Sequence, residues 1–272
     1  MRTILIAFSL FSSLYGAAQD TSITIIPKTT FTVLGGAVYA PRLHYYGRTD
    51  GLKSSALLPT LSIQFDSAHL YASGTSVLLN NKVQSMDYAG TIIEAGYRFG
   101  AQEGFAGNLY ANKFFYNTSQ LPQSALKEQA GFNINYQSKP IIINTAASVA
   151  FSDQADLFAS AGLSKRFIFR KDKTVFLITP AALVHAGSQR YLEENIKNNG
   201  GIIPLPGQQT TSTTYNKFAL LDYEFNTSFV AARKHVFLIV TPSYVMPQNL
   251  RQGETGSDGL YATISLLFSF KH

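Results

Sequence analysis

The sequence predicts an all-β fold: a closed antiparallel transmembrane β-barrel of about twelve strands. Three observations support this prediction. Apolar and polar residues alternate with a period of two along many segments, as they do where strands face lipid on one side and a lumen on the other. Charged residues make up only 14% of the chain, well below the roughly 25% of an average soluble protein. A membrane-spanning helix needs about 18 consecutive apolar residues, and no segment beyond residue 20 approaches that length.

The amino-terminal segment has the pattern of a signal peptide. Met1-Arg2 provides a positive start, an apolar run covers 4–14, and Gly16, Ala17 and Ala18 supply small residues for cleavage. The run is too short to span a bilayer. We therefore expect residues 1–18 to be removed on export and residues 19–272 to form one barrel domain. The alternative interpretation is a buried amino-terminal helix.

The last segment shows the alternation most clearly. One face carries only apolar side chains, namely Leu260, Ala262, Ile264, Leu266, Phe268 and Phe270. The other face carries Tyr261, Thr263, Ser265 and Ser269, with Leu267 as the one exception. A helix would scatter both sets around its circumference, so the period of two predicts a strand.

The same test along the chain predicts twelve strands, with ten or fourteen as alternatives. The expected ranges are 29–39, 54–65, 69–79, 87–99, 105–116, 129–137, 141–151, 156–169, 174–186, 216–231, 236–247 and 259–270. An even number of strands places both termini on the same side, which for an exported chain is the periplasmic side. Closure is expected because an open sheet edge in lipid would leave backbone groups without hydrogen bonds.

The connections between these strands alternate between short turns and longer polar loops. The longer ones fall near 40–53, 80–86, 117–128, 187–215 and 248–258, and we assign them to the external side. The longest contains an apolar stretch with Ile202, Ile203 and Leu205. These residues suggest a lid over the barrel mouth or a partner-binding segment, and the alternative is an ordinary disordered external loop.

These features together resemble the bacterial outer-membrane β-barrel proteins, broadly the porin-like class. The resemblance implies the outer membrane of a Gram-negative cell, contact with its lipid and lipopolysaccharide, and insertion by the barrel assembly machinery. In that class the machinery recognises a final strand that ends in an aromatic residue, a position that Phe270 matches. Lys271 and His272 follow it, whereas the class usually ends on the aromatic itself.

Five charged residues fall on the inward faces of the predicted strands. Charges at membrane depth are costly unless they pair or meet water, so we expect these residues to line the lumen. They are Glu94, Arg98, Arg166, Asp222 and Glu224. The pattern leaves two interpretations open: the residues surround a narrow pore, or they form a salt-bridge network that closes the barrel.

The sequence offers no convincing catalytic or metal-binding arrangement. Absence of cysteine excludes disulfides, thiol catalysis and thiolate metal sites. His185 and Ser188 form the only His/Ser pairing of note, but residues three apart on a strand face opposite sides. We found no clustered metal ligands and no nucleotide-binding motif, so we expect no enzyme, metal or cofactor. The sequence does not support a nucleic-acid partner, because the basic residues are dispersed and we expect the chain to be exported.

Three functions follow as hypotheses. The first is a narrow channel or uptake barrel for small polar or amphiphilic solutes. The second is a closed barrel with a structural or interaction role in an envelope complex. The third, most remote, is a lipid-active enzyme of the outer membrane.

Overall fold

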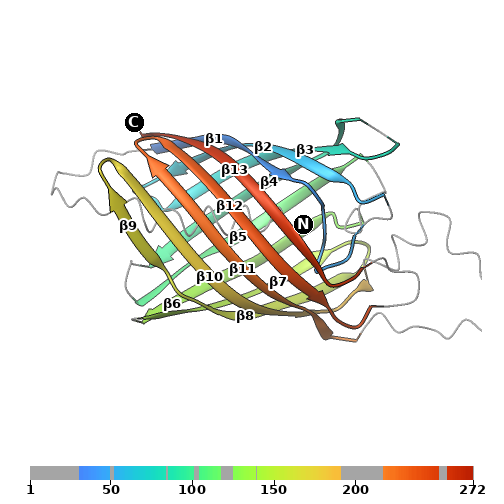
Figure 1. Cartoon of the computed structure of the whole chain (residues 1–272). Coiled ribbons are helices and arrows are strands. Elements are labelled where there is room, and N and C mark those ends of the chain that lie inside the picture. Colours follow the sequence, from blue (N-terminus) through green and yellow to red (C-terminus); the bar gives the residue numbers. More distant parts are fainter. Residues whose placement is uncertain are drawn as a thin grey trace, which may run out of the picture.

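The computed structural model describes residues 31–49, 52–83, 85–100, 104–117, 125–138, 140–190, 217–250 and 256–271. In this part of the chain the named elements are all strands (Figure 1). None of these residues belongs to a helix long and apolar enough to cross a membrane. The strands are β1 (Phe31–Ala40), β2 (Ser55–Phe65), β3 (Leu70–Asn80), β4 (Asp87–Gly100), β5 (Gly104–Tyr116), β6 (Glu128–Ser138), β7 (Ile141–Phe151), β8 (Ala155–Ser164), β9 (Phe167–Lys171), β10 (Thr174–Gly187), β11 (Ala219–Arg233), β12 (Val236–Pro247) and β13 (Gly259–Lys271).

Neighbouring strands pair antiparallel, and the last strand pairs with the first. The β1–β13 ladder runs from Thr32 opposite Lys271 to Tyr39 opposite Ile264, which closes the sheet into a barrel (Figure 1). Both β8 and β9 pair with β10, one after the other. They therefore make a single crossing, and the thirteen strands give a twelve-stranded barrel. The predicted fold class and strand number are confirmed.

The two ends of the barrel differ in their connections. We call the end that holds Phe31 and Lys271 the base, and the opposite end the mouth. At the base, the Asp66 carboxylate in the β2–β3 turn accepts a hydrogen bond from the Thr32 hydroxyl at 3.2 Å and lies 3.5 Å from the Lys271 ammonium group. These contacts tie β13 to the β2–β3 turn across β1, where the barrel closes.

Side chains alternate between a buried inner face and an apolar outer face. On β2, Thr60, Ser62 and Gln64 are buried inside, whereas Leu61 and Ile63 between them are 56% and 39% exposed. The outer face carries such large apolar side chains around the whole barrel. A soluble monomer rarely exposes a continuous apolar surface of that extent. The exterior is therefore suited to lipid, in which closed barrels leave no backbone group unsatisfied.

Three large apolar side chains lie inside the barrel. A β-bulge between β10 and β11 opposes His185 with Asp222 and Ala186 with Leu220, so Leu221 is an extra residue and turns inward. Leu267, the exception to the alternation in β13, is 2% exposed and packs inside near the base. Phe114 is 5% exposed and packs inside near the mouth.

Prolines account for the gaps in three ladders. Pro59 falls where the β2–β3 ladder is interrupted between Leu57 and Thr60. Pro242 falls in a similar gap between β11 and β12. Pro180 lies opposite the interruption at 165–166 that separates β8 from β9. Because proline has no N–H to donate, each one weakens a ladder.

Candidate functional site

The mouth of the barrel is filled by the connection between β1 and β2. Residues 43–49 of this connection are all buried, although the sequence suggested an exposed loop. Tyr45 is 1% exposed and Arg48 is 2% exposed. We call residues 41–49 the mouth loop. Because residues 43–49 are buried, the mouth loop folds into the barrel.

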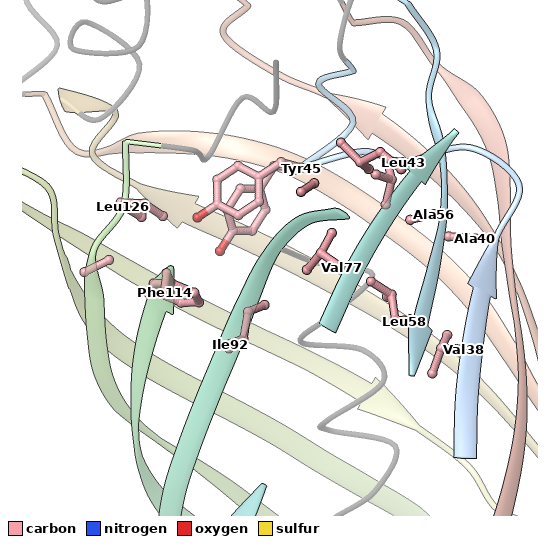
Figure 2. Packing of buried hydrophobic residues seen from close by; sticks show 14 of the residues in the cluster. Val38, Ala40, Leu43, Tyr45, Ala56, Leu58, Val77, Ile92, Phe114 and Leu126 are labelled. Carbon is pink, nitrogen blue, oxygen red and sulfur yellow. The ribbon is translucent and has the colours of Figure 1, made fainter. Parts of the chain in front are cut away.

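Aromatic contacts hold the mouth loop against the wall of β8 and β10. The Tyr46 ring stacks on Phe158 with centroids 5.6 Å apart and lies 5.7 Å from the His185 ring. Tyr45 meets the edge of Phe158 at 6.2 Å. On the opposite wall the loop meets apolar side chains of β1–β5, including Leu58, Val77 and Ile92 of the same cluster (Figure 2). The mouth is thus packed on one side like a small hydrophobic core.

Arg48 anchors the mouth loop to the wall of β11 and β12. Its guanidinium donates to the carbonyl oxygens of Tyr46 (3.0 Å), Leu221 (3.3 Å) and Gln248 (3.1 Å). The bulge at Leu221 explains this contact, because an extra residue in a strand takes its backbone out of the regular ladder. The Tyr261 hydroxyl adds a donor to the Gly47 carbonyl at 3.4 Å.

The two predicted acidic residues of β11 lie beside this anchor. Asp222 and Glu224 are both fully buried at the mouth end of the strand. The Asn226 amide donates to the Glu224 carboxylate at 2.8 Å. Asp222 points inward by the regular alternation of β11, and the bulge places Leu221 beside it on the same side, where the Leu221 carbonyl accepts from Arg48. Buried carboxylates require compensation, and the arginine of the mouth loop is buried on the same wall.

The predicted residues Glu94 and Arg98 belong to a network nearer the base. The Tyr71 hydroxyl donates to the Glu94 carboxylate, which Asn112 also contacts. The Asn108 amide donates to the Tyr71 oxygen at 3.0 Å. The Arg98 guanidinium lies over the Tyr71 ring, 4.6 Å from its centroid.

This network continues to both sides along the inner wall. Arg98 donates to the Gln64 side chain on β2, and the Asn133 amide on β6 donates to Asn108 at 3.0 Å. We call this set, from Gln64 to Asn133, the polar wall. Because its side chains bond one another across β2–β6, the two charges are held against the wall instead of projecting freely into the lumen.

The inner wall of β6, β7 and β8 is less covered than that of β1–β5. Several of its inward side chains are small or amide residues that stay partly exposed inside the barrel, whereas Ile142 and Phe158 on the same wall are buried. The partly exposed residues are Asn133, Asn135, Asn144, Ser148, Ser160 and Ser164. Hydrogen bonds join some of them, such as Asn144 to Ser164 at 2.9 Å. Arg166, the fifth predicted residue, follows Ser164 at the break before β9 and is partly buried. We call the inner surface of β6, β7 and β8 the open wall.

The base also has an apolar arc on the inside. Leu34, Leu177, Val230, Ile239 and Leu267 lie close to the base ends of five neighbouring strands, from β10 around to β1, and pack as one buried cluster. The polar wall and the open wall occupy the strands across the barrel from it. The base half of the interior is therefore apolar on one side and polar on the other.

The His185 and Ser188 side chains are engaged separately. The Ser188 hydroxyl donates to the Asp156 carboxylate at 2.6 Å and accepts from the Leu157 N–H at 3.0 Å. His185 lies against Tyr46. These contacts give Ser188 a structural role in the β8–β10 corner. Among the described ranges, no group of three or more potential metal ligands occurs.

Two further predictions concern other parts of the chain. Phe270, the expected assembly signal, is 51% exposed on the outer face and stacks on His235. The signal peptide (1–18) and the lid residues Ile202, Ile203 and Leu205 lie outside the described residues.

Comparison with known proteins gives architectural relatives only. No protein-family model matches the chain, and no curated protein matches it significantly. Among solved structures, the KdgM porin shares 9% identity at a TM-score of 0.48, covering 88% of this chain and 99% of its own. The NanC porin shares 10% identity at 0.46, with coverages of 88% and 98%. The translocator domain of the autotransporter NalP from Neisseria meningitidis shares 9% at 0.44, with 99% and 97%.

The chain is a β-barrel of the membrane-spanning type. Its closed antiparallel sheet and its apolar exterior establish this.

Sequence reasoning missed the mouth loop, although its composition carried a signal. The run Leu43–Tyr46 holds one leucine, one histidine and two tyrosines, which is too apolar for a loop in water. An aromatic-rich connection on the external side of a barrel is better interpreted as a segment that folds inward.

Proposed function

We propose that this protein is a narrow channel of the outer membrane for small polar solutes. The observation that carries the proposal is the open wall, where inward polar side chains stay partly exposed although the sheet encloses them. Exposed polar groups inside a closed barrel imply water beside them. Amide and hydroxyl side chains there can replace part of the hydration of a passing solute.

The other features of the interior define how narrow the path is. The mouth loop occupies the outer end, so a solute that enters passes it or displaces it. The polar wall fixes Glu94 and Arg98 in place, and such fixed charges of both signs disfavour strong selection for anions or cations. The base, with one apolar side, suits solutes that are partly apolar.

The same mouth loop supports a second candidate function. If the loop stays docked, the barrel is closed and serves as a structural or interaction protein of the envelope. Current through the protein separates the two functions, because only the channel conducts.

Cysteine substitution gives a direct test, because the natural chain has no cysteine. Ser160 faces the lumen from the open wall, and its neighbour Ala161 is exposed on the outer face. We expect purified protein in planar bilayers to give discrete current steps. A charged methanethiosulfonate reagent should reduce the conductance of Ser160→Cys and leave that of the matched control Ala161→Cys unchanged.

Two results would contradict the channel. A folded wild-type protein without current steps favours the closed barrel. Equal sensitivity of both cysteine variants means that the current does not follow the open wall.

We further propose the cellular setting. The chain is exported with a cleaved signal peptide, sits in the outer membrane with its base in the periplasm, and contacts lipopolysaccharide near its mouth. Phe270 in the final strand would serve as the recognition residue for the assembly machinery, because its side chain is exposed on the outer face.

A further inference from the structure

A row of cationic and hydroxyl side chains crosses the outer face at the base of β9–β11. In the ladders, Lys171 lies opposite Thr174, and Thr174 lies opposite Arg233. Residues directly opposite in a sheet share a face, and Lys171 shares the outer face of β9 with Phe169. Neighbouring strands are about 4.8 Å apart, so the backbones of Lys171 on β9 and Arg233 on β11 are about 10 Å apart. Thr174 on β10 lies between them. We call this set the cationic row.

An apolar row lies directly beside it, toward the mouth. Phe169 on β9 opposes Phe176 on β10, which opposes Ala231 on β11, which opposes Leu238 on β12. Phe169, Phe176 and Leu238 are 52%, 40% and 45% exposed. The small Ala231 side chain between two large neighbours leaves a low point in this surface.

The hairpin formed by β9 and β10 extends this surface beyond the end of β7 (Figure 1). β7 pairs with β8 only as far as Ile142 opposite Ser164, so β9 pairs with β10 alone. All five residues of β9 are exposed. The hairpin turn adds Lys173, and the β11–β12 turn adds Lys234, both exposed.

From these rows we infer a binding site for an anionic phospholipid on the outer face of the barrel. The phosphate lies between the Lys171 ammonium, the Thr174 hydroxyl and the Arg233 guanidinium. An acyl chain lies along the low point at Ala231, between Phe176 and Leu238. Lys173 and Lys234 outweigh Asp172, the acidic residue of the hairpin turn, so the site favours a headgroup with net negative charge.

The order of the two rows identifies lipid as the occupant. A free phosphate would use the cationic row and leave the apolar row in water. A diacyl phospholipid satisfies both rows at once, in the order in which a bilayer presents them from chain to headgroup. The site depends on the proposed membrane placement of the barrel and not on conduction, so a barrel that carries no current still binds the lipid.

The opposite end of the exterior offers a matched control. Lys113 and Lys127 are also exposed, but each pairs with a carboxylate, Glu128 and Asp153 respectively. Replacing these two lysines removes the same charge from the protein as replacing Lys171 and Arg233. Their ion pairs already supply the counter-charge, so they make a poor phosphate site.

Native mass spectrometry of the mature chain in a nonionic detergent tests the inference. The probes are phosphatidylglycerol and phosphatidylcholine with identical acyl chains. We expect wild-type protein to prefer phosphatidylglycerol. The double variant Lys171→Gln/Arg233→Gln should bind phosphatidylglycerol at least about tenfold more weakly, since each surface cation contributes severalfold to the affinity. Lys113→Gln/Lys127→Gln should bind as wild type does.

A second variant separates the acyl contact from the charge. Ala231→Leu fills the low point and keeps every cation, so it should weaken phosphatidylglycerol binding. In a separate experiment on wild-type protein, soluble glycerol phosphate should not compete with the lipid. The change in gel mobility on heating verifies that each variant is folded. Equal binding of the two lipids, equal loss in both double variants, or full competition by glycerol phosphate would overturn the inference.

Discussion

Removal of the Arg48 side chain should release the mouth loop. The guanidinium is buried and donates to two carbonyl oxygens of the wall, Leu221 at 3.3 Å and Gln248 at 3.1 Å, besides that of Tyr46 within the loop. A hydrogen bond from a charged donor contributes about 1.5–3 kcal/mol. These contacts are near the long end of the usual range, and water replaces part of them when the loop leaves. We therefore expect Arg48→Ala to weaken docking by about 3 kcal/mol, which changes the ratio of docked to undocked loop by about 100-fold.

Single-channel recording and thiol labelling measure this change. Arg48→Ala should raise the fraction of time spent in a high-conductance state by up to about 100-fold. Phe158→Cys, covered by Tyr45 and Tyr46 in the docked state, should become reactive to a water-soluble maleimide in the Arg48→Ala background. Arg48→Lys should behave nearly like Arg48→Ala, because a single ammonium group lacks the planar fork that reaches several acceptors.

The control is Lys53→Gln, which removes an exposed cation from the same β1–β2 connection. It should leave both readouts unchanged. If Arg48→Ala keeps the wild-type conductance and Phe158→Cys stays unreactive, Arg48 does not hold the loop and our account of the mouth is wrong.

Three further predictions concern stability and assembly. Tyr71→Phe removes a hydroxyl that both donates and accepts inside the barrel. It should lower the free energy of unfolding by about 2 kcal/mol, measured by urea unfolding from vesicles. The control Tyr97→Phe on the outer face should have little effect. Gly96→Ala should cost about 1–3 kcal/mol in the same assay, because the new Cβ would lie 2.5 Å from a backbone oxygen, whereas Gly74→Ala meets nothing within 4 Å; equal stability of the two would refute the packing argument. Phe270→Ala should lower the amount of assembled barrel in cells without preventing refolding of purified protein, and unchanged assembly in cells would exclude a signal role.

Strand positions could be predicted from the sequence because lipid and lumen impose opposite demands on successive residues. In β13, for example, the outward residues must be apolar and the inward ones need not be, so alternation alone identifies the strand. A shift of the strand register by one residue would move every side chain of the strand to the opposite face of the sheet. That constraint explains why the closed fold and the number of strands are confirmed, although the expected strand 156–169 is divided into β8 and β9.

Local irregularities escaped the same reasoning. An extra residue such as Leu221 reverses the alternation at one point, and period-two counting then assigns the wrong face. The mouth loop escaped for a different reason: long-range contacts from Arg48 to β11 and β12 decide that it folds inward, and a sequence read segment by segment contains no such contacts. The polar wall was found only in part, since Glu94 and Arg98 carry charge whereas Tyr71, their common partner, does not.

The central claim is that lipid surrounds this barrel and water lies within it, and a spin-label scan along β8 tests it most directly. Single cysteines at positions 157, 159, 160, 161, 163 and 164 would carry a nitroxide in vesicles. Collision rates would be measured against oxygen, which concentrates in lipid, and against a water-soluble nickel complex. We predict that oxygen dominates at Leu157, Ala159, Ala161 and Leu163 and that nickel access is higher at Ser160 and Ser164. Uniform access of the nickel complex along the strand, or no alternation, would contradict the account.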